Sequence, residues 1–146
     1  MRHISLSLIV YVFVVFAILY GLTLLFGWFD TIAWFDVPMH LIGGMWIGLV
    51  FLYLFSGFFQ SDVYAHHAER VKVLLLGIGF AAFIGILWEF FEFGLDAFFS
   101  LALQVSVADN MKDLLMDIIG GGVVVAWALF YHRSRTKSDA SAIPVM

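Results

Sequence analysis

The sequence predicts an all-α protein, a polytopic four-helix transmembrane bundle with both termini cytoplasmic. Hydrophobic residues make up 64% of the 146-residue chain and charged residues only 12%, and long apolar stretches alternate with short polar ones. A soluble domain would carry about 25% charged residues. This composition excludes a nucleic-acid-binding protein. The chain has no cysteine, which excludes disulfides and thiolate metal ligands.

The first two predicted spans, at about residues 4–26 and 38–59, form one helical hairpin. The first span is longer than the apolar core of a secretory signal peptide and has no small-residue cleavage site near its end, so we expect it to be retained. A short loop of aromatic and acidic residues, suited to the bilayer interface, connects the two spans. Pro38 fits the opening turn of the second helix because its missing N–H costs nothing there.

A polar segment separates this hairpin from a second one, whose spans are expected at about 71–99 and 110–131. The longer of these stretches can tilt or extend into the interface. The membrane domain is therefore expected to cover residues 1–132. Residues 133–146 are basic, small and polar, which predicts a flexible cytoplasmic tail.

The basic residues are divided unevenly between the two sides of this predicted bundle. One side carries Arg2, Arg70, Lys72, Arg133, Arg135 and Lys137. The other side carries only Lys112. Because Lys and Arg are enriched in cytoplasmic loops, the richer side, with both termini, is predicted to face the cytoplasm.

The second half of the third predicted span contains acids and no bases. Glu89, Glu92 and Asp96 fall on one face of a helix at 100° per residue. A carboxylate inside a membrane-length segment is costly unless it is paired, so an acid there is by default a functional residue with a nearby partner. Glu89 lies roughly 25 Å along the helix from Lys72, in the outer half of a hydrocarbon core about 30 Å thick.

Candidate partners for these acids lie at the same predicted depth. His40 is in the opening turn of the second span, and Asp36 precedes it by one turn. The fourth span opens with acids at i, i+4 and i+8, namely Asp109, Asp113 and Asp117. Small residues accompany them: Gly44 and Gly48 form a G-x-x-x-G pattern, and Gly120–Gly122 follow the acids of the fourth span. Such residues allow membrane helices to approach closely, so the polar stripes are expected to face inward.

This cluster of carboxylates around one imidazole suits a divalent cation such as Mg²⁺, Mn²⁺, Fe²⁺ or Zn²⁺, which would offset acids that cannot all ionise together. The predicted metal ligands are His40, Glu89, Glu92, Asp113 and Asp117. Asp36 and Asp109 are expected to support these ligands from outside. Simpler interpretations exist: Asp109 is suited to a helix N-terminus, and a histidine at a helix start is often a capping residue. Shared protons would relieve the excess charge without a metal.

Three short motifs carry a resemblance to a known family. They are Asp36-Val37-Pro38-Met39-His40, Trp88-Glu89-Phe90-Phe91-Glu92 and Asp109-Asn110-Met111-Lys112-Asp113, the last leading to Ile119-Gly120-Gly121. In this order and spacing they resemble the YjdF-like inner-membrane protein family, with a weaker likeness to the VanZ-like family associated with glycopeptide resistance. The resemblance covers roughly residues 30–125. It implies a bacterial inner (plasma) membrane protein with a shared polar site, and it supplies no reaction.

Three classes of function fit these observations. The first is a divalent-metal site near the outer leaflet, with an enzyme acting on a lipid or envelope precursor as its most specific form. No motif matches an established metalloenzyme signature such as H-E-x-x-H. The second is an ion- or proton-coupled permease, which with four spans would require a homo-oligomer. The third is a structural or assembly subunit of a larger membrane complex, in which a hydrogen-bonded network holds the helices together. Membrane lipids are expected partners in all three.

Overall fold

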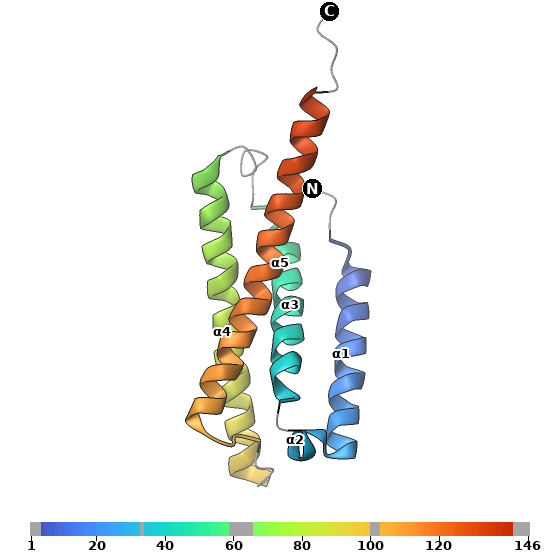
Figure 1. Cartoon of the computed structure of the whole chain (residues 1–146), viewed down its shortest axis with the longest axis vertical. Coiled ribbons are helices and arrows are strands. Elements are labelled where there is room, and N and C mark those ends of the chain that lie inside the picture. Colours follow the sequence, from blue (N-terminus) through green and yellow to red (C-terminus); the bar gives the residue numbers. More distant parts are fainter. Residues whose placement is uncertain (1–3, 33, 59–65, 100–102, 142–146) are drawn as a thin grey trace, which may run out of the picture.

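The computed structural model describes residues 4–32, 34–58, 66–99 and 103–141, without the side chains of 29, 30 and 132–141, and all regular structure in this part of the chain is helical (Figure 1). The helices are α1 (Leu6–Phe26), α2 (Trp28–Thr31), α3 (Asp36–Phe55), α4 (His67–Phe99) and α5 (Val107–Ser141).

Four of these helices, α1, α3, α4 and α5 up to Tyr131, are long and apolar enough to cross a membrane, which confirms the predicted fold class. The helices alternate in direction, so that α1 begins and α5 ends at the same end of the bundle, with α2 at the opposite end (Figure 1). We call these the termini end and the α2 end. The cytoplasmic position of the termini end stays a prediction.

The sequence around α1 explains where this helix starts and stops. The Ser5 hydroxyl accepts a hydrogen bond of 3.2 Å from the backbone N–H of Leu8, which caps the first turn. Gly27 ends the helix in the left-handed conformation, with φ 62°, where a residue with a Cβ would be strained. Thr31 then donates its hydroxyl proton to the Gly27 carbonyl, 2.9 Å away, within the short helix α2. This helix occupies part of the expected aromatic loop.

The boundaries of α3 differ slightly from those expected. The helix begins at Asp36, two residues before Pro38, and it ends at Phe55 rather than near Phe59. Pro38 therefore lies in the first turn, where its missing N–H leaves no hydrogen bond unmade. The earlier start places Asp36 on the same helix as His40, one turn away.

Helix α5 is longer than expected, because it begins at Val107 and continues to Ser141. Residues 133–141, predicted as flexible tail, thus continue the helix. The reason is local: no glycine or proline interrupts the chain between Tyr131 and Pro144. The rest of the predicted tail, residues 142–146, and most of the polar segment between α3 and α4 lie outside the described residues.

Helices α3 and α5 are in backbone contact, and glycines make this contact possible. A Cβ added to Gly44 would overlap the backbone carbonyl oxygen of Asp117, and one added to Gly120 would overlap the backbone of α3. A Cβ on Gly48 would lie 2.9 Å from the carbonyl oxygen of Gly121. No side chain fits at these positions without movement of a helix. The close approach predicted from the G-x-x-x-G pattern is confirmed, and it brings the polar residues of α5 against α3.

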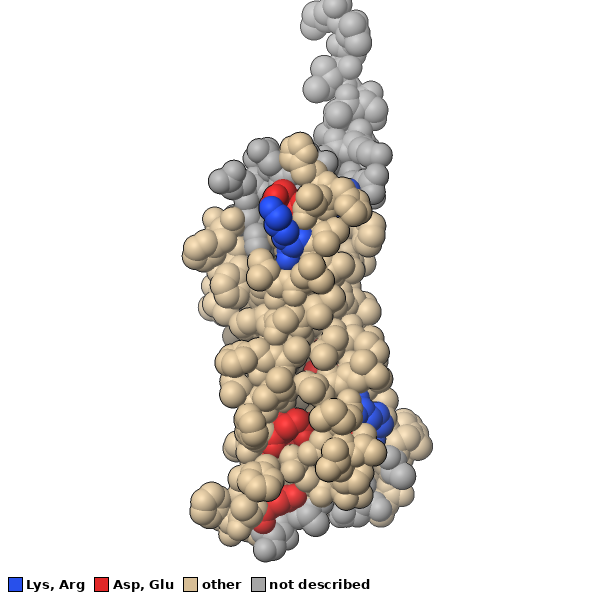
Figure 2. Space-filling model, turned by 90° about the vertical axis from the view of Figure 1, so that its left-hand side faces the viewer, with Lys and Arg blue, Asp and Glu red and all other residues tan. Residues whose placement is uncertain are grey.

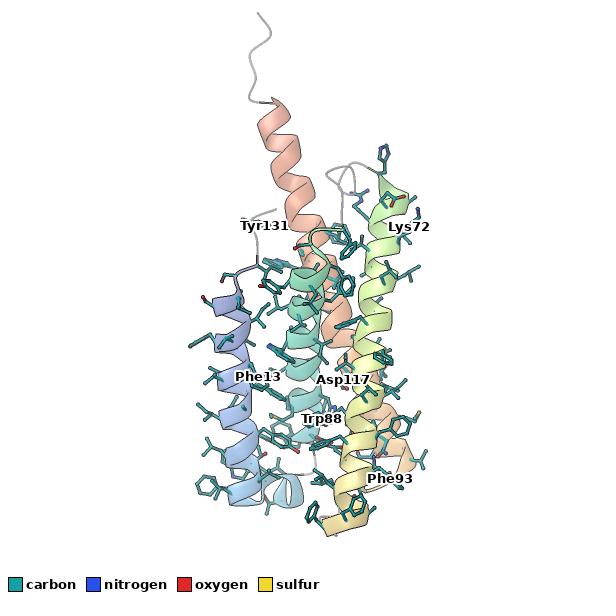
Figure 3. All side chains as sticks on the ribbon, turned by 180° about the vertical axis from the view of Figure 1, so that it is seen from behind. Phe13, Lys72, Trp88, Phe93, Asp117 and Tyr131 are labelled. Carbon is teal, nitrogen blue, oxygen red and sulfur yellow. The ribbon has the colours of Figure 1, made fainter. Side chains whose placement is uncertain are left out.

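The two halves of the bundle have different interiors. An apolar core fills the half toward the termini end, and it consists of Phe51, Leu52, Val73, Val125 and Leu129. Lys72 and Tyr131 lie near this end (Figure 3). Helix α1 flanks α3 and contributes Ile9 and Thr23 to the buried residues. The Trp46 indole N–H donates to the Ile9 carbonyl at 3.0 Å and so ties α1 to α3. The half toward the α2 end contains the buried ionisable residues His40, Asp113 and Asp117.

Candidate functional site

Ionisable side chains from three helices gather in the half of the bundle toward the α2 end. They are Asp36 and His40 on α3, Glu89 and Glu92 on α4, and Asp113 and Asp117 on α5. Red acidic atoms reach the surface in this half on the face shown in Figure 2, within a largely uncharged surface. Within this group, Asp117 lies close to the middle of the bundle along its long axis (Figure 3). The three polar stripes expected from the sequence therefore do converge.

His40 lies at the centre of this group, with 7% of its surface exposed. Its Nδ1 atom is 3.3 Å from Oδ2 of Asp117, and its Nε2 atom is 3.4 Å from Oδ1 of Asp36. Asp117 comes from α5, whereas Asp36 precedes His40 by one turn of α3. Both nitrogens of the ring thus face carboxylates, and both can donate only if the imidazole is protonated.

Asp117 occupies a space that glycines leave open. It is 3% exposed. A Cβ added to Gly85 of α4 would lie 2.8 Å from its Oδ2 atom, and one added to Gly43 would lie 3.9 Å from its Oδ1 atom. Without a side chain at Gly85, the carboxylate fits between α3 and α4. The glycines beside the acids therefore shape the site as well as the helix crossing.

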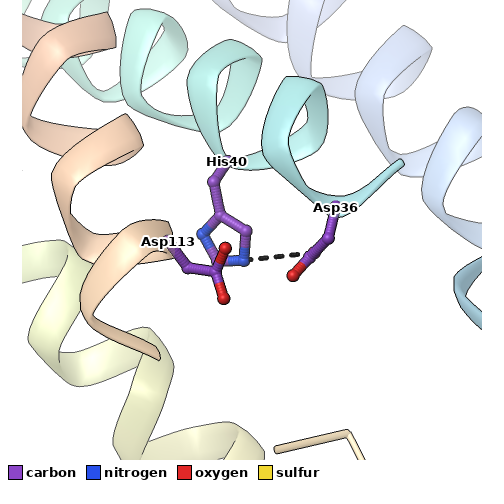
Figure 4. Close-up of side chains that lie close together, drawn as sticks. All are labelled: Asp36, His40 and Asp113. Carbon is purple, nitrogen blue, oxygen red and sulfur yellow. Dashed lines mark ion pairs between the residues drawn. The ribbon is translucent and has the colours of Figure 1, made fainter. Parts of the chain in front are cut away.

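Asp113 is one turn closer to the start of α5 and is 4% exposed. Its Oδ1 atom has no hydrogen-bond partner among the described residues, and the Lys112 ammonium lies 3.7 Å from it. One ligand atom each from Asp36, His40 and Asp113 lie within 4.8 Å of one another, a separation that allows the three to share a metal ion (Figure 4). A buried carboxylate oxygen without a donor is costly, so its position indicates a missing partner.

Glu89 and Glu92 form a second such group with His40, again with ligand atoms within 4.8 Å. The expected approach of Glu89 to His40 across α3 and α4 is therefore present. Oε2 of Glu89 accepts a hydrogen bond of 3.2 Å from the Gln104 side-chain amide, whereas its buried Oε1 atom has no partner in the described chain. Glu92 accepts a hydrogen bond of 2.9 Å from the indole N–H of Trp88.

The remaining predicted residues have other positions. Asp109 is paired with Lys112 at the start of α5 and belongs to neither metal-capable group. Asp36, expected to support the ligands from outside, is itself in one of these groups, whereas Asp117 contacts His40 but is in neither. Asp96, the third acid of the α4 stripe, accepts hydrogen bonds of 2.7 and 2.8 Å from the backbone N–H groups of Leu103 and Gln104. It therefore holds the connection to α5.

The model of one family, described as "Predicted membrane protein (DUF2238)", matches residues 1–134. The chain belongs to this family. The match includes all four apolar helices up to Tyr131 and the whole polar cluster. Neither the curated proteins nor the solved structures contain a match to this chain. The likeness to the VanZ-like family is not found.

In this DUF2238 protein, two residues that contact the cluster had no predicted role there. Gln104 precedes α5 in a connecting segment, yet its side-chain amide donates to both the backbone carbonyl and the carboxylate of Glu89. Trp88 is within one of the three motifs but had no predicted role, and its indole N–H donates to the Glu92 carboxylate. The i, i+4 spacing of Trp88 and Glu92 was a usable signal. For Gln104 no local signal existed, because the contact depends on how the connection folds back.

A cavity of about 120 Å³ adjoins the cluster. Asp36, His40 and Asp117 line it, and its other walls are apolar or aromatic side chains of α1, α3 and α4 together with Tyr20. The Tyr20 ring contacts the Trp88 ring edge to face, with centroids 5.8 Å apart. The polar cluster therefore meets an apolar space inside the bundle.

Proposed function

We propose that this membrane protein binds one divalent metal ion through His40, Asp36 and Asp113, and that it uses the ion on a lipid or envelope precursor. The observation that carries the proposal is the buried Oδ1 atom of Asp113, which has no hydrogen-bond donor among the described residues, on a side chain that converges with Asp36 and His40. A cation would satisfy this oxygen and offset the surrounding acids. Among the described residues, the five carboxyl groups at the cluster have His40 and Lys112 as their cationic partners, so full ionisation without a further cation is unfavourable.

The surroundings of the imidazole support His40 as a ligand. In the tautomer with the proton on Nδ1, this nitrogen donates to Asp117 and the lone pair on Nε2 is directed toward Asp36. A carboxylate on the far nitrogen is the usual support of a metal-binding histidine. The 3.4 Å between Nε2 and Oδ1 of Asp36 is long for a hydrogen bond. It equals the separation of roughly 3.4 Å expected for two ligands of one tetrahedral ion at about 2.1 Å each.

Glu89 and Glu92 approach the same imidazole from α4. We propose that Glu89, whose buried Oε1 atom has no partner among the described residues, would be a further ligand to a bound ion or would hold a proton beside it. Oxygen and imidazole ligands suit Mg²⁺, Mn²⁺, Fe²⁺ and Zn²⁺. No thiolate competes, because the chain has no cysteine.

We further propose that the YjdF-like and DUF2238 names describe one family, that the protein is in a bacterial inner membrane, and that the termini end is cytoplasmic. The uneven placement of bases supports this orientation, which puts the cluster near the outer leaflet. Membrane lipids are the expected partners.

Elemental analysis of the purified protein tests the proposal. We expect close to one equivalent of a divalent metal, a fall in the thermal midpoint after chelation, and recovery when the metal returns. Asp113→Asn and His40→Ala should lose the metal. Glu69→Gln is the matched control, because Glu69 is an exposed acid of α4 that pairs with Lys72 outside the cluster.

The two alternative functions predict other outcomes. A proton-sharing permease or a hydrogen-bonded assembly subunit would contain no metal and would not respond to a chelator. In the assembly case, Asp113→Asn would change co-purification with other membrane subunits in mild detergent. A metal-free protein whose stability is the same with and without chelator would therefore exclude the proposed metal centre.

A further inference from the structure

The cavity beside the cluster has a polar end and an apolar end. Asp36, His40 and Asp117 line the polar end. The apolar part extends along α3 to Trp46 and Ile47, roughly 10 Å beyond His40 at 1.5 Å per residue. The indole N–H of Trp46 is already bonded to the Ile9 carbonyl, so its ring offers only an aromatic surface to the cavity. The walls of the cavity thus change from ionisable to apolar side chains along the axis of α3.

Helix α1 forms the wall of the cavity that lies nearest the surface of the bundle. Phe13 and Phe16 of α1 line it, and 47% of the Phe13 surface is exposed. Both residues lie within an apolar helix that is long enough to span the membrane, so we expect the surface beside them to face lipid chains. A lipid chain can therefore enter beside α1 without crossing water.

The chemistry of the walls identifies the occupant. Away from Asp36, His40 and Asp117 the walls are apolar or aromatic, and such walls accept apolar molecules, as an apolar cavity of about 150 Å³ accepts benzene. A pocket that combines apolar walls with a few convergent polar groups is typical of a small-molecule site. We propose that the cavity binds one hydrocarbon chain of a membrane amphiphile whose polar head lies at His40. This inference rests on the proposed function for the head group, which would reach the metal ion, and it names the substrate class of that site.

Gly43 offers a direct way to close the cavity. It lines the space, and a Cβ added to it would lie 3.7 Å from the Phe16 ring, at ordinary van der Waals distance. Gly43→Leu should therefore fill the cavity without a backbone clash, and Gly43→Ala should fill it partly. Gly79 of α4 has no atom within 4 Å of an added Cβ, so Gly79→Leu is the matched control outside the cavity.

Photocrosslinking in vesicles of phosphatidylethanolamine and phosphatidylglycerol tests this inference. The probe is a phospholipid with a diazirine midway along one acyl chain, at a distance from the head group that matches the roughly 10 Å between His40 and Ile47, and the readout is mass-spectrometric labelling of Ile47. Because only 7% of Ile47 is exposed, surrounding lipid cannot reach it from outside the bundle. We expect Ile47 to be labelled, unlabelled phospholipid to compete, and Gly43→Leu to lower the labelling about tenfold, with Gly79→Leu unchanged.

Absence of Ile47 labelling in the wild-type protein would overturn the inference, as would labelling that Gly43→Leu leaves unchanged. If Gly43→Leu does not fold, two other results test the inference: competition by unlabelled phospholipid in the wild type, and partial loss of Ile47 labelling in Gly43→Ala. Metal content measured on the same samples separates the two hypotheses. If the protein contains metal but Ile47 is not labelled, the proposed metal centre stands and chain binding in the cavity is refuted. If Ile47 is labelled in a metal-free protein, chain binding stands and the metal centre is refuted.

Discussion

His40 connects the three helices of the site through its two ring nitrogens. Nδ1 contacts Asp117 of α5, Nε2 contacts Asp36 of its own helix, and the ring faces Glu89 and Glu92 of α4. Three of the acids have different further partners: an indole N–H for Glu92, an amide for Glu89, and an ammonium near Asp113. Acids of the same type in the sequence therefore occupy different environments in the structure.

At the residue scale we expect Asp117→Asn to weaken metal binding about 10- to 100-fold, because it removes the negative charge that orients the His40 ring. The substitution is nearly isosteric, so it should fit the space beside Gly85 and leave the fold intact. Competition with a fluorescent chelator measures the affinity, and circular dichroism measures the helix content.

Asp109→Asn is the control for this substitution. Asp109 is on the same helix, two turns earlier, and pairs with Lys112 outside the metal-capable groups. Its change should alter the affinity by less than about threefold. An Asp117→Asn protein with unchanged metal affinity would show that Asp117 does not support the ligand.

At the scale of the elements, the crossing of α3 and α5 depends on glycine. We expect Gly44→Ala to destabilise the protein by about 1–3 kcal/mol or more, because the added methyl group overlaps the Asp117 backbone and forces the helices apart. Unfolding in mixed detergent micelles measures the change in the free energy of unfolding. The same separation should move Asp117 away from His40 and reduce the metal content.

Gly79→Ala provides the comparison for this substitution in a helix interior. An added Cβ at Gly79 meets nothing within 4 Å, so we expect no loss of stability and a gain of up to about 1 kcal/mol from helix propensity. Equal effects of Gly44→Ala and Gly79→Ala would argue against close contact between α3 and α5.

At the scale of the whole molecule, the orientation in the membrane decides which side reaches the cluster. The chain has no cysteine, so single cysteines can be introduced without a background. We expect a membrane-impermeant maleimide to label Val105→Cys in intact cells, and to label His66→Cys only after permeabilisation. Both residues are exposed, and they precede α4 and α5, two helices that begin at opposite ends of the bundle (Figure 1). The reversed pattern would place the cluster near the cytoplasmic leaflet and invert the predicted topology.

The sequence by itself determined the features that follow from local patterns. Apolar stretches of membrane length predict four helices, and the period of 3.6 residues predicts which acids share a face. The uneven positions of the bases predict an orientation, and the glycine pattern predicts a close helix contact. These inferences need only residue type and spacing, so they identified α3, α4 and α5 as the helices that carry the polar site. They also named His40, Glu89 and Asp113 as members of the cluster.

Only the tertiary structure decided how these groups are combined. A face and a depth do not give the rotation of one helix against another, which here depends on backbone contact at Gly44 and Gly120. That rotation places Asp117 on Nδ1 of His40 and leaves Asp113 to converge with Asp36. The contact of Gln104 with Glu89 and the cavity beside α1 likewise depend on segments far apart in sequence. Such distances result from the packing of whole helices, and no local pattern of residues encodes them.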